Sequence, residues 1–154
     1  MTRSFMPVLM VAAGLAGFAV SLPAAAQFAK PEDAIRSRRA GMTMMATHFG
    51  RVAAMANGRV PFDAKAAADN AELATIISKL PYAGFVEGSD KGETKAEPKI
   101  WTEMDKFRAA ASKLQDEMAK LNVVAKTGNL DAIKAAVGET GKACKACRDA
   151  YRKE

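Results

Sequence analysis

The chain has 154 residues, a length that fits one domain with a hydrophobic core and is short for two. Its 23 basic and 17 acidic residues give a net charge of +6, spread along the chain rather than gathered with aromatic residues, which argues against a nucleic-acid-binding protein. The two cysteines and one histidine are too few for a closed structural zinc site, which takes four such ligands.

Residues 1–26 have the pattern of a secretory signal peptide. Arg3 is the positive n-region, residues 5–22 are uncharged and mostly apolar, and an alanine run precedes the expected cleavage before Gln27. An uncleaved membrane anchor is the alternative, because this apolar stretch is near the lower limit for spanning a bilayer. We expect cleavage, and one exported domain, 27–154, in the bacterial periplasm with no membrane segment in its mature form.

The first predicted helix begins at Pro31, because proline suits the first turn of a helix, and ends at Gly58. Arg38 is unusual on its core-facing side: it is either buried and paired with an anion, or close enough to the helix start to reach solvent. His48 lies on another side of the helix and is expected at the surface. The core-facing positions, spaced by threes and fours, are Ile35, Arg38, Met42, Met45, Phe49, Val52 and Ala56.

The second predicted helix is capped by Asp63 and stopped by Pro81. Its expected core positions are Ala66, Asn70, Leu73, Ile77 and Leu80. Leu73, Ile76 and Ile77 make the apolar face wider than one core contact requires, which leaves a broad core stripe and a homodimer contact both open. Glycines, prolines and charged residues over 81–99 predict a long loop.

Two further helices follow this loop. The third starts near Pro98 and ends at Gly128, and its core positions are Ile100, Met104, Phe107, Ala111, Leu114, Met118, Leu121 and Ala125. The fourth is capped by Asn129, with core positions Leu130, Ile133, Val137, Thr140, Cys144, Cys147 and Tyr151. The predicted fold is all-α, an antiparallel four-helix bundle with one long loop between the second and third helices.

Both cysteines of the chain, Cys144 and Cys147, fall on the core-facing side of the fourth helix. A Cys-x-x-Cys pair can be half a zinc site, a redox dithiol, a disulfide or two buried thiols, or the pair of thioether anchors of a c-type haem. A redox dithiol belongs near a helix start after a strand, which this chain does not offer. The haem motif continues with histidine, whereas this sequence has Arg148.

Several segments together resemble the cytochrome c′ family of four-helix, class II c-type cytochromes. They are Gln27-Phe-Ala-Lys-Pro-Glu-Asp-Ala34, Met45-Ala-Thr-His-Phe-Gly-Arg51, Leu80-Pro81, Pro98-Lys-Ile-Trp101 and Cys144-Lys-Ala-Cys-Arg-Asp-Ala-Tyr-Arg152. The resemblance implies a periplasmic homodimer with one covalent haem c per chain. It also implies electron transfer with a redox partner protein, binding of nitric oxide or carbon monoxide, and no enzymatic turnover.

By position, the resemblance makes Cys144 and Cys147 the thioether anchors. It places further residues near the haem: Arg38, Arg39 and Met42 from the first helix, with Met42 on the distal side, Lys95 and Ala96 from the long loop, and Arg152 near the proximal site. Lys99 replaces the glutamate that is usual before Ile-Trp.

Arg148 stands where the family has its iron-ligating histidine, and a guanidinium has no lone pair to offer a metal. Met42 is either a distal thioether ligand or a packed core methionine. We therefore expect a haem protein with altered axial ligation. The alternative is a haem-free helical binding or structural module that has kept the fold.

Overall fold

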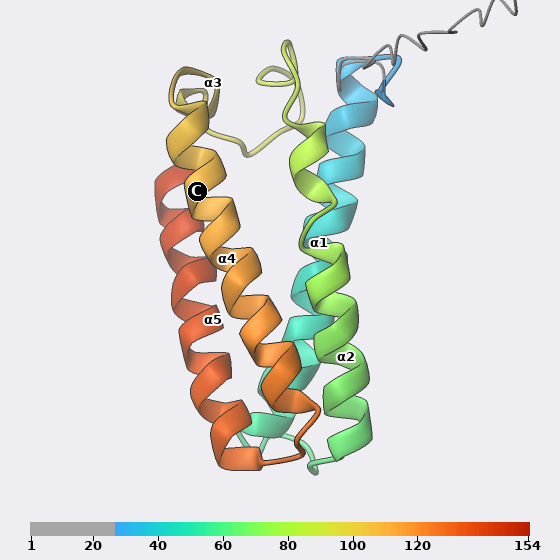
Figure 1. Cartoon of the computed structure of the whole chain (residues 1–154). Coiled ribbons are helices and arrows are strands. Elements are labelled where there is room, and N and C mark those ends of the chain that lie inside the picture. The colour runs from blue at the N-terminus through green and yellow to red at the C-terminus, as the bar shows by residue number, and fades with distance from the viewer. Residues whose placement is uncertain (1–26) are drawn as a thin grey trace, which may run out of the picture.

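The computed structural model describes residues 27–154, so the predicted signal peptide 1–26 lies outside the described residues. Four long helices form an antiparallel bundle (Figure 1): α1 (Pro31–Ala56), α2 (Ala64–Ile77), α4 (Met104–Ala125) and α5 (Leu130–Tyr151). The 3-10 helix η2 (Pro81–Gly84) and the short α3 (Lys99–Thr102) lie between α2 and α4. The predicted fold class is confirmed. In the described part of the chain, no helix is both long and apolar enough to cross a membrane.

The helix ends follow the local sequence. Pro31 occupies the first turn of α1. The Asp63 side chain accepts a hydrogen bond from the backbone N–H of Ala66, and Asn129 caps α5 in the same way. Gly58 and Gly128 follow α1 and α4 with φ of 70° and 69°, a conformation that glycine adopts without strain.

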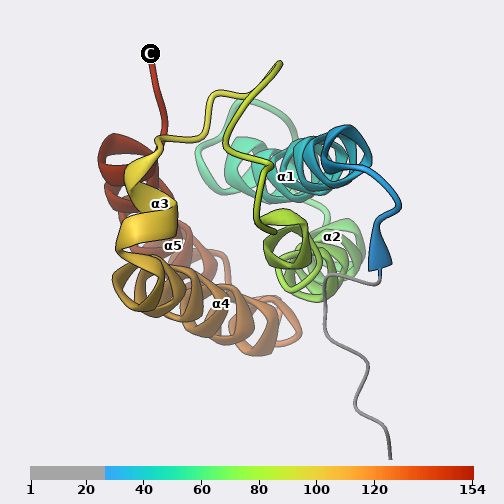
Figure 2. The same ribbon diagram turned by 90° about the horizontal axis from the view of Figure 1, so that it is seen from above.

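The helices pack as two pairs, α1 with α2 and α4 with α5, and α2 also packs against α4. Seen from above, the segment after η2 crosses from the α1–α2 pair to the α4–α5 pair (Figure 2). All four long helices contribute to one core cluster near the middle of the bundle: Met45, Ala74, Ile77, Leu114, Met118 and Ala143. A second cluster lies towards the end where α1 finishes: Val52, Ala56, Ala71, Leu121, Ala125, Ile133 and Val137.

The predicted core face of α2 is wrong at Leu73 and Leu80, while Ala66 and Asn70 are half-buried. Leu73 is 43% exposed and Leu80 is 61% exposed, whereas the buried residues of this helix are Ala67, Ala71, Ala74 and Ile77. The physical reason is side-chain size, because alanines at the contact let neighbouring helices approach closely while larger apolar residues stay outside. A hydrophobicity pattern gives weight to leucine over alanine and so selected the wrong face.

Three other expectations need correction. The third helix is interrupted at Glu103, whose backbone (φ −125°, ψ 38°) is not helical, so α3 and α4 are separate. Leu130 is 38% exposed at the start of α5. His48 is half-buried rather than at the surface, with Nδ1 2.9 Å from the Asn70 Oδ1. This contact joins α1 to α2 and explains the polar residue in the second helix.

The 3-10 helix η2 lies directly against α1. A Cβ placed on Gly84 would come within 2.7 Å of the Ala34 carbonyl oxygen and 2.9 Å of the Arg38 Cβ. A Cβ on Gly41 would be 3.0 Å from the Pro81 ring. Two glycines, one on each element, therefore allow this close approach. It fixes the position of the residues between Pro81 and Gly84.

Candidate functional site

An aromatic cluster occupies the end of the bundle at which α1 begins and α5 ends. The Phe85 ring lies 4.6 Å from Phe107 and 6.1 Å from Trp101, measured between ring centroids. Phe107 in turn lies 5.7 Å from Tyr82 and 5.2 Å from Tyr151. These five residues, from η2, α3, α4, α5 and the loop after η2, make an apolar wall. We call them the aromatic cluster.

The two cysteines lie on α5 close to this cluster. Both are half-buried free thiols, and Cys144 packs with Met42 against the middle core cluster. Burial raises the pKa of both thiols. For Cys144 the neighbouring Cys147 raises the pKa further, while Arg148 lowers it. A redox-active pair requires a lowered thiol pKa. The raised pKa of both thiols therefore argues against a redox dithiol.

Arg38 is buried, with 3% of its surface exposed, and this decides against the solvent-reaching alternative. Its guanidinium donates four hydrogen bonds of 2.7 Å, to the carbonyl oxygens of Gly84 and Ser89 and to the hydroxyl oxygens of Ser89 and Thr94. It also lies 4.6 Å from the centroid of the Phe85 ring. Burial lowers its pKa to about 10, opposed by the charge of Asp90.

The anion expected for a buried Arg38 is therefore replaced by neutral oxygens. Within residues 27–154 no carboxylate lies within ion-pair distance of this guanidinium. The acceptors come from the end of η2 and the loop that follows it. Arg38 thereby fastens the segment 84–94 to α1.

Replacing Arg38 by leucine is expected to destabilise the fold by about 3–5 kcal/mol, because three buried acceptors and one partly buried acceptor lose this donor. Urea unfolding measures the loss, and hydrogen exchange over residues 84–94 should speed up. Arg39→Leu is the matched control: Arg39 is exposed, donates to the Glu93 carbonyl at 3.2 Å, and should cost about 0.5 kcal/mol or less. Equal effects of the two variants would contradict this role for Arg38.

The remaining residues expected at the site fall into two places. Met42 is half-buried on α1, and Arg39 is exposed beside the loop. Lys95 and Ala96 lie against the end of α5, where an isolated bridge pairs Ala96 with Arg152 and the Lys95 carbonyl accepts from the Lys153 N–H at 2.8 Å. The structure thus brings Lys95, Ala96 and Arg152 together, while Arg38 and Arg39 contact the preceding part of the same loop.

Arg148 is exposed on α5, one residue after Cys147. Its backbone carbonyl accepts the Arg152 N–H at 3.0 Å. Among the described residues, no three histidine, cysteine, aspartate or glutamate side chains gather into a metal site.

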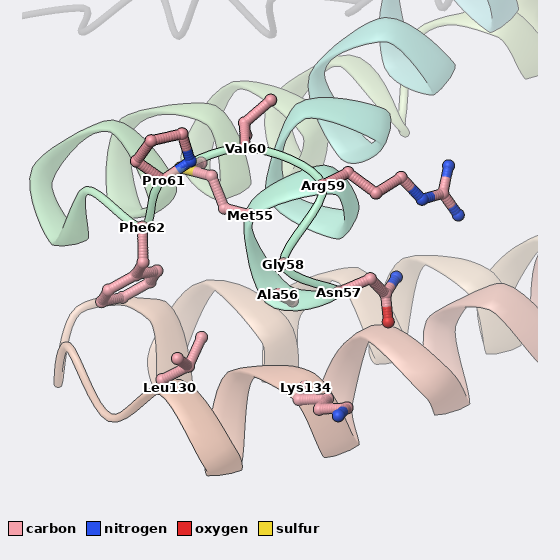
Figure 3. A pocket seen from close by; sticks show the side chains of 10 residues that line it. All are labelled: Met55, Ala56, Asn57, Gly58, Arg59, Val60, Pro61, Phe62, Leu130 and Lys134. Carbon is pink, nitrogen blue, oxygen red and sulfur yellow. The ribbon is translucent and has the colours of Figure 1, made fainter.

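A groove beside Cys147 runs between α4 and α5 and has a volume of ≈ 410 Å³. Alanines from both helices form part of its wall, and charged side chains form as much of it: Lys113, Glu117, Glu139 and Lys142. A larger depression of ≈ 620 Å³ lies at the opposite end of the bundle, where the turn after α1 meets Leu130 and Lys134 (Figure 3). Of these two depressions, only the groove between α4 and α5 is lined by a cysteine.

Sequence reasoning missed Tyr82, Phe85 and Phe107 as parts of the site. Their signal was present, because aromatic residues concentrate between 82 and 107 and again at Tyr151. Ser89 and Thr94, the partners of Arg38, carry no comparable signal. They act through a loop conformation that no sequence pattern predicts.

Comparison with known proteins gives a consistent result. A family model described as Cytochrome C' matches residues 33–152. Cytochrome c' of Rubrivivax gelatinosus is 51% identical over 129 residues, covering 83% of this chain and 100% of that protein. Its crystal structure has a TM-score of 0.79 at 52% identity, covering 82% of this chain and 100% of that chain.

Two further solved structures are similar. Cytochrome c prime from Shewanella frigidimarina has a TM-score of 0.80 at 42% identity, covering 82% of this chain and 99% of that chain. A nitric oxide complex of a point mutant of cytochrome c prime from Alcaligenes xylosoxidans has a TM-score of 0.77 at 42% identity, covering 82% of this chain and 98% of that chain.

Proposed function

Because the chain belongs to the cytochrome c′ family, we propose that it is a periplasmic c-type haem protein that transfers electrons, binds a diatomic gas such as nitric oxide or carbon monoxide, or does both. One haem c would be attached through Cys144 and Cys147. When bound, haem iron supplies a one-electron redox couple and an open position for a small ligand. We propose a carrier and gas binder rather than an enzyme.

The observation that carries the proposal is the position of the two cysteines. They are half-buried on α5, Cys144 packs with Met42 against the middle core cluster, and the aromatic cluster reaches α5 at Tyr151. Two neighbouring thiols on one helix beside an apolar wall support the attachment of a large flat apolar group. The attachment residues therefore fit a haem.

Position 148, where the family has its iron ligand, does not fit a haem. Arg148 has the sequence position of the family's iron-ligating histidine, and a guanidinium stays protonated and cannot bind iron. We propose that this residue leaves the iron without its usual protein ligand. The packing of Met42 against the core supports its interpretation as a core methionine rather than a free thioether.

One experiment tests the function. The protein is matured in a bacterial periplasm, reduced, and exposed first to carbon monoxide and then to nitric oxide. We expect a covalent haem whose Soret band shifts with each gas. If the protein carried haem but its spectrum responded to neither gas, electron transfer would be the remaining proposed function. A colourless protein would favour the haem-free module, which the arginine at position 148 supports.

The homodimer is also part of the proposal. Exposed apolar residues lie on α1, on α2 and in the link that follows α2: Met44, Leu73, Ile76 and Leu80. Ile77, expected with them, is buried and belongs to the core. An apolar stripe of this kind on two adjacent helices supports a contact between two copies.

Replacing Ile76 by glutamate should turn the dimer into a monomer, because a charge would have to be buried at the contact. Sedimentation velocity measures the mass. Val123→Glu is the matched control, since Val123 is 68% exposed on α4, away from this face, and Ile76 is 55% exposed. The contact is misplaced if the Ile76 variant stays dimeric or the Val123 variant dissociates.

Export is the last part of the proposal. The alignment with the Rubrivivax gelatinosus protein covers all of that protein and 83% of this chain, which supports removal of the signal peptide 1–26. N-terminal sequencing of the secreted protein should begin at Gln27. A sequence beginning at Met1 in the membrane fraction would favour the uncleaved anchor.

A further inference from the structure

Two segments that are far apart in the sequence pair along their backbones at the end of the bundle where α5 finishes (Figure 2). Ala96, before α3, forms an isolated antiparallel bridge with Arg152, which directly follows α5. The Lys95 carbonyl accepts the Lys153 N–H at 2.8 Å. This pairing brings the basic residues before α3 together with those at the end of α5.

Five exposed cations lie on or beside this pairing, and within residues 27–154 none of them has a carboxylate at ion-pair distance. The Arg148 carbonyl accepts the Arg152 N–H at 3.0 Å, so these two arginines are one turn apart. The Lys99 ammonium lies 5.7 Å from the centroid of the Tyr151 ring. We call the five residues the cation cluster: Lys95, Lys99, Arg148, Arg152 and Lys153.

Lys95 and Lys153 stand opposite each other across the backbone pairing. Opposite residues of an antiparallel pair project to the same side, and like charges in this arrangement are destabilising. Among the described residues, Glu97 makes no ion pair with either lysine. The fold therefore keeps two positive charges together at a cost in stability, which a negatively charged partner would remove.

The dipole of α5 explains only part of the cation cluster. Cations stabilise the C-terminal end of a helix, and this accounts for Arg148 and Arg152. It does not account for Lys95 and Lys99, which belong to other segments, or for Lys153, which lies beyond the helix. These three lysines need another explanation.

The surroundings of the cation cluster favour a protein partner over a lipid bilayer. No large apolar side chain is exposed among residues 91–99 or 145–154, so nothing in these segments would insert into a bilayer. Carboxylates are interspersed with the cations: Glu97 is half-buried before α3, and Asp149 pairs with Lys145 on α5. Such a mixed pattern, in which positive charge prevails, is complementary to the acidic surface of a folded protein.

We infer that the cation cluster is the docking surface for an acidic protein that exchanges electrons with this chain. This inference rests on the proposed function. One electron would pass from the reduced partner to the haem, so that the partner is oxidised and the iron is reduced from ferric to ferrous. Because Arg148 directly follows Cys147, a partner docked there would lie beside the end of α5 that carries the attachment residues. The cations would also steer the encounter.

The test compares two double variants that change the net charge equally, in the haem-loaded protein. Lys99→Glu/Lys153→Glu alters the cation cluster, whereas Arg59→Glu/Lys134→Glu alters two exposed cations at the opposite end of the bundle (Figure 3). Reduced flavodoxin, a small acidic flavoprotein, is the electron donor in stopped-flow absorption. At low salt we expect the cluster variant to react about 10-fold more slowly and the control to stay within about 2-fold of the parent.

The outcomes separate the docking surface from the haem function. Equal slowing by both double variants would overturn the docking surface, because net charge alone would then explain it. Unchanged rates in both would overturn it as well, and in either case the haem function stands. A chain that carries no haem would remove the proposed function and the electron transfer with it.

A second readout needs no haem. A labelled poly-glutamate peptide represents an acidic surface, and fluorescence anisotropy measures its binding to the chain. The cluster variant should bind this peptide about 10-fold more weakly than the parent and the control variant do. Equal binding by the two double variants would overturn the docking surface. Tighter binding of the parent to phosphatidylglycerol vesicles than to the peptide would overturn the choice of a protein partner.

Lys153→Glu by itself separates docking from folding. It should need the same or a higher urea concentration to unfold, because an attraction to Lys95 replaces a repulsion. A clear loss of stability would show that Lys153 serves the fold, and its role in docking would fail.

Discussion

Replacing both Cys144 and Cys147 by serine is expected to abolish covalent haem attachment completely. Serine has nearly the shape of cysteine, but its oxygen forms no thioether with the haem. The variant should lose the Soret band that resists denaturation and organic extraction in the parent protein. Its fold should persist, because both positions are only half-buried and neither contributes a disulfide.

Ala135→Ser is the matched control for the cysteine variant. Ala135 is exposed on α5 and lies outside the groove beside Cys147, so the change adds a hydroxyl to the same helix without touching a thiol. It should retain full haem content. If the double cysteine variant retained extraction-resistant haem, attachment at these residues would be refuted.

Replacing Arg148 by histidine is expected to have the second large effect. It places an imidazole, a good iron ligand, next to Cys147 at the family's axial position. The reduction potential should change on the order of 0.1 V, because the axial ligand is a main determinant of haem potential. The Soret band should change shape at the same time, and the haem content of the purified protein should rise.

Arg148→Gln separates ligation from charge. Glutamine removes the positive charge and keeps a flexible polar side chain, and the lone pair of its amide nitrogen is delocalised and does not bind iron. Its spectrum should match that of the parent. An Arg148→His protein with the potential and spectrum of the parent would mean that another residue already binds the iron, or that position 148 does not face it.

The sequence predicted the bundle because its helix signals are local. Pro31, Asp63, Asn129, Gly58 and Gly128 act within one turn of a helix end, and the structure places each in the expected role. The spacing of apolar residues was also reliable where the core residues are large. All positions expected in the core from Phe107 to Ala125 are buried.

The prediction from sequence failed where side-chain size decides which residues are buried, and where contacting residues are far apart in the chain. The core face of α2 consists mainly of alanines, so the large residues Leu73 and Leu80 misled the periodicity argument. The partners of Arg38 lie 46 to 56 residues away in the chain and include backbone carbonyls, which have no sequence signature. An anion was the reasonable expectation for a buried arginine, and the loop supplies neutral oxygens instead.

The sequence indicated only some residues of the candidate site. Cys144 and Cys147 stand out as the two cysteines of the chain, and Arg148 as a departure from a haem motif. Tyr82 did not stand out, because a single tyrosine after a proline resembles any loop aromatic. Its burial depends on the packing of η2 against α1, which no sequence pattern predicts.

The most direct test of the central claim is the intact mass of the protein purified from its own periplasm, read together with its absorption spectrum. We expect the mass of residues 27–154 plus one haem, with a Soret band that differs from that of the Arg148→His variant. The mass of the bare chain without a Soret band would contradict haem attachment and leave only the fold.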